Sequence, residues 1–193
     1  MRNAPLALVL ILAATFAGCA PTLYRSPANF DYRVAHLQPT LSDSLLDDKG
    51  QKPEPGRIAA TLLKSGDITL EPSAGAHIGL IAKPTPELAS KAETSFIAAD
   101  GDQRIRISVP PNTYAVGFYI HGPNSAPPPQ GSAVIASFGG APDFRVDVPG
   151  PGYEQLGASF VGILSFKPIT SVTWIPGPGS SSTSISGLVT ERR

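Results

Sequence analysis

The sequence predicts an all-β protein: an antiparallel β-sandwich of jelly-roll-like type with at most one or two short helices, preceded by a cleaved signal peptide. Three observations predict this fold. The 19 glycines and 21 prolines make up about a fifth of the 193 residues and leave little room for long helices. Short runs of alternating apolar and polar residues recur between turns that contain Gly or Pro. A hydrophobic content of 41% is enough to form a core.

The first elements after the N-terminal segment are a strand and a polar connection. Residues 30–38 alternate loosely through Phe30, Tyr32 and Val34, which predicts a first strand. Residues 40–56 are polar and contain several prolines and glycines, so we expect a surface connection there.

Short strands and one helix follow. Residues 85–92 predict the helix, with Thr85 as the N-cap and Pro86 at the first helical position. Asp100 and Gly101 form a turn signal that favours a hairpin. The strands expected in this part of the chain are residues 57–63, 67–71, 77–82 and 95–98.

The second half shows the clearest alternation. Residues 104–109 alternate strictly, with Ile105, Ile107 and Val109 on the inward face. Residues 110–112 (Pro-Pro-Asn) turn the chain. In the next strand Phe118 lies on the inward face, and Tyr119 falls on the opposite one. Five further strands are expected at residues 133–138, 144–148, 160–166, 172–175 and 184–189.

Large aromatic side chains supply the expected core of a single β-sandwich domain over residues 30–193. One domain suits a chain of this length. The expected core aromatics are Phe118, Phe144, Phe160, Phe166 and Trp174.

The N-terminus has the pattern of a secretory signal peptide. Arg2 gives a basic start, and residues 4–16 form an uncharged apolar stretch. Ala17 and Gly18 are small, as a signal peptidase requires, and Cys19, the only cysteine of the chain, follows directly. This placement predicts cleavage between Gly18 and Cys19.

The tetrapeptide from Phe16 to Cys19, Phe-Ala-Gly-Cys, resembles the bacterial lipobox, which favours Leu where this chain has Phe16. The resemblance implies that residues 1–18 are removed, that the Cys19 thiol carries diacylglycerol, and that the new amino group is acylated, for example with palmitate. Residues 19–29 then form a lipidated tether. By analogy with lipoprotein sorting, Ala20 after the cysteine favours the outer membrane, facing the periplasm or the exterior. Two alternatives stay open: an uncut membrane anchor, which would be short for a bilayer, and a plain secretory signal.

Charge and cysteine content exclude several functions. The formal net charge is zero, so we expect no nucleic-acid partner, which would require a basic surface to neutralise phosphates. One cysteine excludes an intrachain disulfide framework and a cysteine-rich zinc site. We therefore expect no cofactor or metal. The lipid anchor makes the membrane an expected partner.

About half of the chain carries a family resemblance. The segments are residues 105–110 (IRISVP), 112–118 (NTYAVGF), 144–148 (FRVDV), 160–163 (FVGI), 168–174 (PITSVTW) and 184–189 (SISGLV). Their order resembles the jelly-roll-like β-sandwich ectodomains of PEP-CTERM bacterial surface proteins. The chain departs from that family in having no Pro-Glu-Pro motif near its end, so the resemblance implies the fold and not exosortase sorting.

No catalytic motif is present. We find no Gly-x-Ser-x-Gly elbow, no Ser-x-x-Lys and no phosphate loop. Aromatic rings on β-sandwiches often stack on sugars, so the candidate ligand-binding residues are Tyr119, Tyr153 and Trp174. His121, at the end of the strand that holds Tyr119, is a fourth candidate. Each also has the plainer interpretation of packing or simple exposure.

These observations predict a lipid-anchored cell-envelope protein without catalysis, in a structural or binding role. Its partner would be a glycan, an envelope polymer or another protein. The alternative is an envelope carbohydrate hydrolase, whose paired carboxylates only the fold would bring together.

Overall fold

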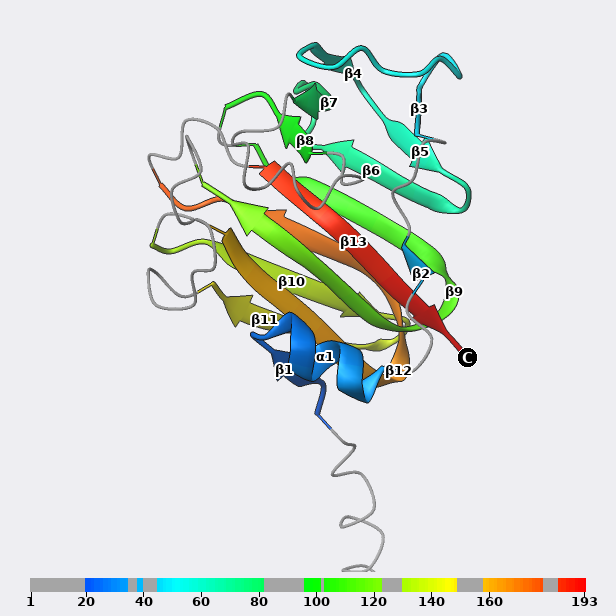
Figure 1. Cartoon of the computed structure of the whole chain (residues 1–193), viewed down its shortest axis with the longest axis vertical. Coiled ribbons are helices and arrows are strands. Elements are labelled where there is room, and N and C mark those ends of the chain that lie inside the picture. Colours follow the sequence, from blue (N-terminus) through cyan, green and yellow to red (C-terminus); the bar gives the residue numbers. More distant parts are fainter. Residues whose placement is uncertain are drawn as a thin grey trace, which may run out of the picture.

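The computed structural model describes residues 20–34, 38–39, 45–81, 96–101, 103–122, 130–148, 158–178 and 184–193. It shows an antiparallel β-sandwich with one short helix, which confirms the predicted fold class (Figure 1). The strands are β1 (Thr22–Tyr24), β2 (Gln38–Pro39), β3 (Leu46–Asp47), β4 (Ile58–Ala60), β5 (Leu63–Ser65), β6 (Ile68–Pro72), β7 (Ile78–Ile81), β8 (Phe96–Ala99), β9 (Ile105–His121), β10 (Ala133–Phe138), β11 (Ala141–Asp147), β12 (Ala158–Ile175) and β13 (Ser184–Arg192); the helix is α1 (Pro27–Arg33).

Two long strands, β9 and β12, run through both layers of the sandwich. The first half of β9 pairs with β6 and the second half pairs with β13. In the same way, one half of β12 pairs with β1 and the other pairs with β10. We call the layer β11-β10-β12-β9-β6-β5-β3 sheet I, and the layer β1-β12-β9-β13-β8-β7-β4 sheet II; β2 extends sheet II beside β13.

Each long strand changes layer at an irregularity. On β9, Asn112 adopts a left-handed φ of 60°, which Asn tolerates better than most residues, and the Thr113 hydroxyl donates to the Pro110 carbonyl at 2.7 Å. On β12, the Lys167 amide donates to Ser165 Oγ at 3.0 Å. The expected turn at residues 110–112 is therefore a bend within one strand. The strands expected at residues 160–166 and 172–175 are likewise parts of the single strand β12.

The main core lies between the two sheets. In sheet II, Ile120, Ile185, Ile97 and Leu80 form one cross-strand row, and all four are buried. Sheet I contributes a facing row that includes Leu63, Leu70, Ile107, Val172 and Ala136. Residues from β5, β6 and β7 thus pack in the same core as the second half of the chain.

The expected core aromatics have different positions. Phe118 and Trp174 are fully buried in the main core, as predicted. Phe144 is partly buried at its margin, and Phe160 belongs to a second cluster on the outer face of sheet II. The prediction for Phe166 was wrong: its side chain is 67% exposed, because it lies in the irregular part of β12 where the alternation breaks.

The N-terminal segment is part of the fold rather than a tether. β1 pairs with β12 from Thr22 opposite Leu164 to Tyr24 opposite Gly162. The strand expected over residues 30–38 is wrong in its first part, because α1 occupies residues 27–33. Pro27 stands at the start of the helix, where its missing amide hydrogen costs nothing. Phe30 and Val34, one helical turn apart, are the buried pair.

The other predictions for the first half of the chain have mixed outcomes. Asp100 and Gly101 do not close a hairpin, because β8 pairs with β7 and β13 and is separated from β9 by β13. The strands predicted around residues 67–71 and 77–82 are confirmed as β6 and β7. The helix expected at residues 85–92 lies outside the described residues. In the described part of the chain, no helix is long and apolar enough to cross a membrane.

Helix α1 packs on the outer face of sheet II through one ring. Phe30 lies over Gly117 and Gly162; a Cβ atom built on these glycines would lie 2.7 Å and 2.6 Å from the ring. The Phe30 ring also meets Phe160, with centroids 5.6 Å apart. The absence of side chains at Gly117 and Gly162 therefore leaves the space into which Phe30 packs, and this contact holds α1 on sheet II.

We predict that Gly162→Ala lowers the free energy of unfolding by about 1–3 kcal/mol, because the new methyl group would displace the Phe30 ring. Gly139→Ala is the matched control, since a Cβ there would meet only Thr170 Cγ2 at 3.9 Å. Urea unfolding measures both. Combining Gly162→Ala with Phe30→Ala should reduce the cost of the glycine change. Equal losses of stability in Gly162→Ala and Gly139→Ala would contradict the packing of Phe30 on Gly162.

Candidate functional site

The structure separates the residues that we expected to bind a ligand. Trp174 is fully buried on the inner face of sheet I, between Val134 and Ile105, so its interpretation as a sugar platform is wrong. Tyr153, Gly18 and Cys19 lie outside the described residues. Tyr119 and His121 do share a face, the outer face of sheet II, as the alternation predicts.

His121 is buried at the end of β9. Its side chain is 2% exposed, and its Nε2 lies 2.7 Å from Ser186 Oγ on β13. Burial lowers the pKa of His121 to about 4. The imidazole is therefore neutral at physiological pH and serves as a buried hydrogen-bonding group between two strands.

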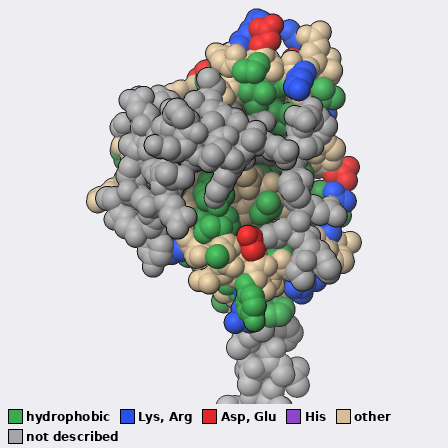
Figure 2. All heavy atoms as spheres, viewed as in Figure 1, with side chains coloured by type: hydrophobic (Ala, Val, Ile, Leu, Met, Phe, Trp, Pro, Cys, Tyr) green, Lys and Arg blue, Asp and Glu red, His purple; other side chains and the backbone are tan. Residues whose placement is uncertain are grey.

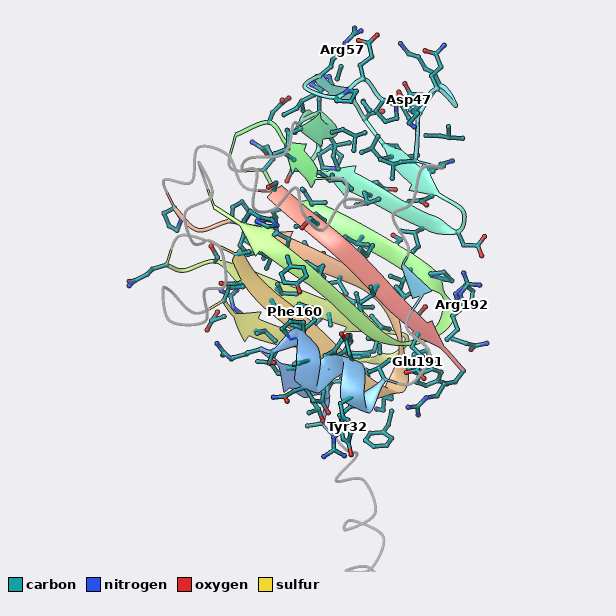
Figure 3. The ribbon with its side chains drawn as sticks, in the orientation of Figure 1. Tyr32, Asp47, Arg57, Phe160, Glu191 and Arg192 are labelled. Atoms are coloured by element: carbon teal, nitrogen blue, oxygen red, sulfur yellow. The ribbon has the colours of Figure 1, made fainter. Side chains whose placement is uncertain are left out.

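Tyr119 is half-buried beside helix α1. Its ring meets the ring of Phe160 edge-on, with centroids 5.2 Å apart. Burial raises the pKa of the Tyr119 hydroxyl, and the carboxylate of Asp31 on α1 raises it further. Figure 3 places Phe160 next to α1. The part of the outer face around Tyr119 is thus a packing surface for the helix.

A polar cleft lies at the other end of the molecule from α1. Its volume is about 150 Å³. Figure 3 shows Asp47 and Arg57 at this end. The lining residues come from β3, the following loop, β4 and β7: Asp47, Asp48, Lys49, Gln51, Lys52, Pro53, Glu54, Arg57, Ala59, Ala60 and Ile78.

Hydrogen bonds fix one wall of this cleft. Asp47 Oδ1 accepts the backbone amides of Lys49 at 2.9 Å and Gln51 at 2.7 Å, which holds the loop in place. Asp48 Oδ2 accepts the hydroxyl of Thr61 at 3.1 Å. The cleft therefore has a defined shape, although it is built largely from a loop.

The rim of the cleft carries both signs of charge. Arg57 Nη1 lies 3.6 Å from Glu54 Oε2, and both side chains are well exposed. Within the described ranges, neither Lys49 nor Lys52 forms an ion pair. The lining thus combines charged donors and acceptors with the buried apolar residues Ala60 and Ile78, a combination that suits a neutral ligand with many hydroxyl groups.

The sequence did not predict this cleft. We interpreted residues 40–56 as a plain surface connection, because charged loops are usually only solvated. The available signal was the density of charge from Asp47 to Arg57, a segment that holds six charged residues.

The chemistry of the cleft favours binding. Asp47 and Asp48 are engaged in hydrogen bonds that maintain the loop, and Glu54 pairs with Arg57. Acid–base hydrolysis of a glycoside needs two carboxyl groups that flank the substrate bond. Over the described ranges, no group of three or more His, Cys, Asp or Glu side chains could hold a metal ion.

Comparisons with known proteins give weak likenesses. No protein-family model and no curated protein matches the chain. The chain is similar to the solved carbohydrate-binding module TmCBM61 in complex with β-1,4-galactotriose, with 17% identity over 66% of this chain and 90% of that chain, and a TM-score of 0.41. It is also similar to the family 11 carbohydrate-binding module of a cellulosomal cellulase of Clostridium thermocellum, with 11% identity over 71% and 94% of the two chains and a TM-score of 0.36. A third similar structure is a Clostridium thermocellum family 11 module in complex with a β-1,3-1,4-mixed-linked tetrasaccharide. Its identity to this chain is 12%, the match covers 69% of this chain and 94% of that chain, and the TM-score is 0.34. Likenesses of this strength identify no ligand for the present chain, and the resemblance to PEP-CTERM ectodomains stays a prediction.

We predict that acid destabilises the fold through His121. The pKa of His121 is about 4 in the folded chain and near its ordinary 6.5 when unfolded, so the unfolded chain binds more protons between these pH values. The free energy of unfolding should therefore fall as the pH drops through this window, by up to about 3 kcal/mol. In His121→Gln this part of the pH dependence should disappear. Denaturant unfolding at several pH values measures it, and the same series with His77→Gln checks that the effect belongs to His121. Parallel curves for wild type and His121→Gln would refute the assignment.

Proposed function

We propose that this chain is a lipid-anchored protein of the bacterial cell envelope that binds a glycan through the cleft between β4 and the 47–54 loop. The observation that carries the anchor is the position of Cys19, the only cysteine, directly after Ala17 and Gly18 at the end of an apolar stretch. Ala20 behind it favours the outer membrane.

The start of the fold supports this proposal. β1 begins at Thr22, only three residues after Cys19. Three extended residues span about 10–11 Å. Acyl chains on Cys19 would therefore hold the edge of sheet II close to the lipid headgroups, and two or more chains would make the attachment stable.

The direction of the molecule supports the binding role. β1 and α1 lie at one end of its long axis, and β3 and β4 lie at the other (Figure 1). A chain anchored next to β1 would hold the cleft at the far end, away from the membrane. There it would meet polymers of the envelope rather than lipid.

The side chains of the cleft suit a glycan. Sugar hydroxyls both donate and accept hydrogen bonds, and the cleft rim offers carboxylates, ammonium groups, a guanidinium and the Gln51 amide. A second cavity of about 330 Å³ is lined by Thr61 and Leu62, which follow β4, and by residues 71–77. The role that we propose is binding without catalysis.

We predict that Cys19→Ser abolishes lipid attachment. The wild-type protein expressed in a bacterial host should carry the added mass of acyl chains and stay with the membrane fraction. Cys19→Ser should lack that mass, because no other residue of the chain supplies a thiol. Intact-mass spectrometry and membrane fractionation measure this. An unmodified sulfur at Cys19 in the wild-type protein would refute the anchor.

We predict that the double variant Lys52→Ala with Arg57→Ala weakens glycan binding about tenfold, since each lost charged donor contributes about 1.5–3 kcal/mol at most and rim exposure reduces that figure. The full chain in detergent is tested on an array of bacterial envelope glycans. Arg145→Ala is the control, because Arg145 forms a comparable exposed pair with Asp147 on β11. Absence of binding by the wild type at millimolar glycan, or equal losses in variant and control, would contradict the proposal.

A further inference from the structure

Large hydrophobic side chains are seldom exposed in the described part of this protein. Those that are exposed are Tyr32 at 85%, Phe166 at 67% and Leu46 at 42%. Leu46 belongs to β3, at the end of the molecule that carries the cleft. Tyr32 and Phe166 belong to α1 and β12 and require another explanation.

Tyr32 points away from the sandwich. On α1 the buried residues Phe30 and Val34 face sheet II. Tyr32 lies between them in sequence, about 200° around the helix from Phe30, so its ring is on the opposite side. Figure 3 shows Tyr32 at the lower end of the molecule, below the helix and near the start of the described chain. The Arg33 guanidinium lies 5.9 Å from the centre of its ring.

Phe166 lies in the irregular middle of β12, just beyond the part of that strand that pairs with β1. Thr22 pairs with Leu164, and the two strands are antiparallel. Phe166 is two residues beyond Leu164, and Ala20 is two residues before Thr22, so both extend from the same end of this strand pair. Ala20, the first residue after Cys19, and Phe166, the most exposed phenylalanine of the described chain, therefore both lie just beyond the Thr22–Leu164 end of this pairing.

The charged residues of α1, of the connection before it and directly after Phe166 are mostly basic. Arg25 lies in the connection from β1 to α1, Arg33 ends the helix, and Lys167 follows Phe166. Asp31 is the carboxylate of α1, and it faces Tyr119. A cationic region of this kind favours anionic lipid headgroups, although the net charge of the whole chain is zero.

We propose that Tyr32 and Phe166, flanked by Arg25, Arg33 and Lys167, form a docking surface that rests on the same bilayer as the acyl chains of Cys19. This inference rests on the proposed function, because the anchor brings the surface to the membrane. Aromatic rings are favoured at the boundary between headgroups and acyl chains, and basic side chains complement anionic lipid. With only two residues, Ala20 and Pro21, between the anchor and β1, the second contact is effectively intramolecular and needs little affinity of its own.

Docking would fix the orientation of the sandwich. A single flexible attachment would let the molecule lie on its side, with the cleft against the membrane. Contacts at Tyr32 and Phe166, together with the anchor, hold the long axis away from the bilayer and the 47–54 loop outward.

The test places a fluorescent dye at each position. Tyr32→Cys and Phe166→Cys are made separately in the full chain, labelled with an environment-sensitive nitrobenzoxadiazole dye, and reconstituted in vesicles of phosphatidylethanolamine and phosphatidylglycerol. Leu46→Cys is the matched control, since Leu46 is also an exposed hydrophobic side chain but lies at the opposite end. The parent chain treated with the same dye gives the background from Cys19.

At positions 32 and 166 we expect a blue-shifted emission that nitroxide-bearing lipids quench, and at position 46 a water-like emission without quenching. Water-like emission at 32 and 166 in protein whose Cys19 carries lipid would overturn the docking surface and leave the anchor standing. Blue-shifted, quenched emission in protein whose Cys19 is unmodified would support the docking surface and contradict the anchor. Equal shifts at all three positions would also overturn the proposal, because they would indicate non-specific adhesion.

Discussion

The pairing of β9 with β12 is the interaction on which the rest of this structure depends. The two strands pair from Ala158–His121 at one end to Trp174–Ile105 at the other, and each belongs to both sheets. Because the layer change occurs at offset irregularities, residues 109–112 on β9 and 165–168 on β12, neither strand can bend without the other. The rows of Ile, Leu and Val side chains that fill the core face each other only when both bends have formed. Every other strand of the described sheet, including those from the first half of the chain, is joined to this pair directly or through a series of paired strands.

Local periodicity predicted much of the strands and little of their order. Alternation identified the buried faces of residues 105–109 and of the strand that holds Phe118, because side-chain direction follows from the backbone alone. The failure at Asp100 and Gly101 has a different cause: β13 lies between β8 and β9, and pairing between distant segments is decided by the packing of the whole sheet. The helix was missed because Phe30, Tyr32 and Val34 satisfy a period of two, while the spacing of Phe30 and Val34 alone is also that of one helical turn. What favours the helix is its packing partner: Gly117 and Gly162 on sheet II leave space for the Phe30 ring.

The candidate site was likewise predicted only in part. Tyr119 and His121 were correctly placed on one face, but nothing local indicates that α1 packs there or that Ser186 holds the imidazole. For Trp174 both a core position and an exposed position were open, and the cross-strand neighbours Val134 and Ile105 place it in the core. The cleft escaped notice because its walls come from a loop, β4 and β7, whose proximity only the fold creates. Its signal was a density of charge, which is typical of a solvated loop as well as of a polar binding surface.

The packing of β1 and α1 also changes what an anchor at Cys19 can do. A free tether over residues 19–29 would let the sandwich rotate and move far from its attachment point. In the structure Tyr24 and Phe30 are in ring contact, with centroids 5.7 Å apart, and Phe30 fills the space above Gly117 and Gly162. The chain is therefore fixed to sheet II from Thr22 onward, and the freedom that remains is that of three residues. A lipid-anchored sandwich built in this way has one end committed to the membrane, so any surface that binds an envelope polymer must lie toward the other end. In the described structure, that end is formed by β3, β4 and the charged 47–54 loop. The pairing of the three-residue strand β1 thereby determines on which side of the molecule a binding cleft can face the envelope.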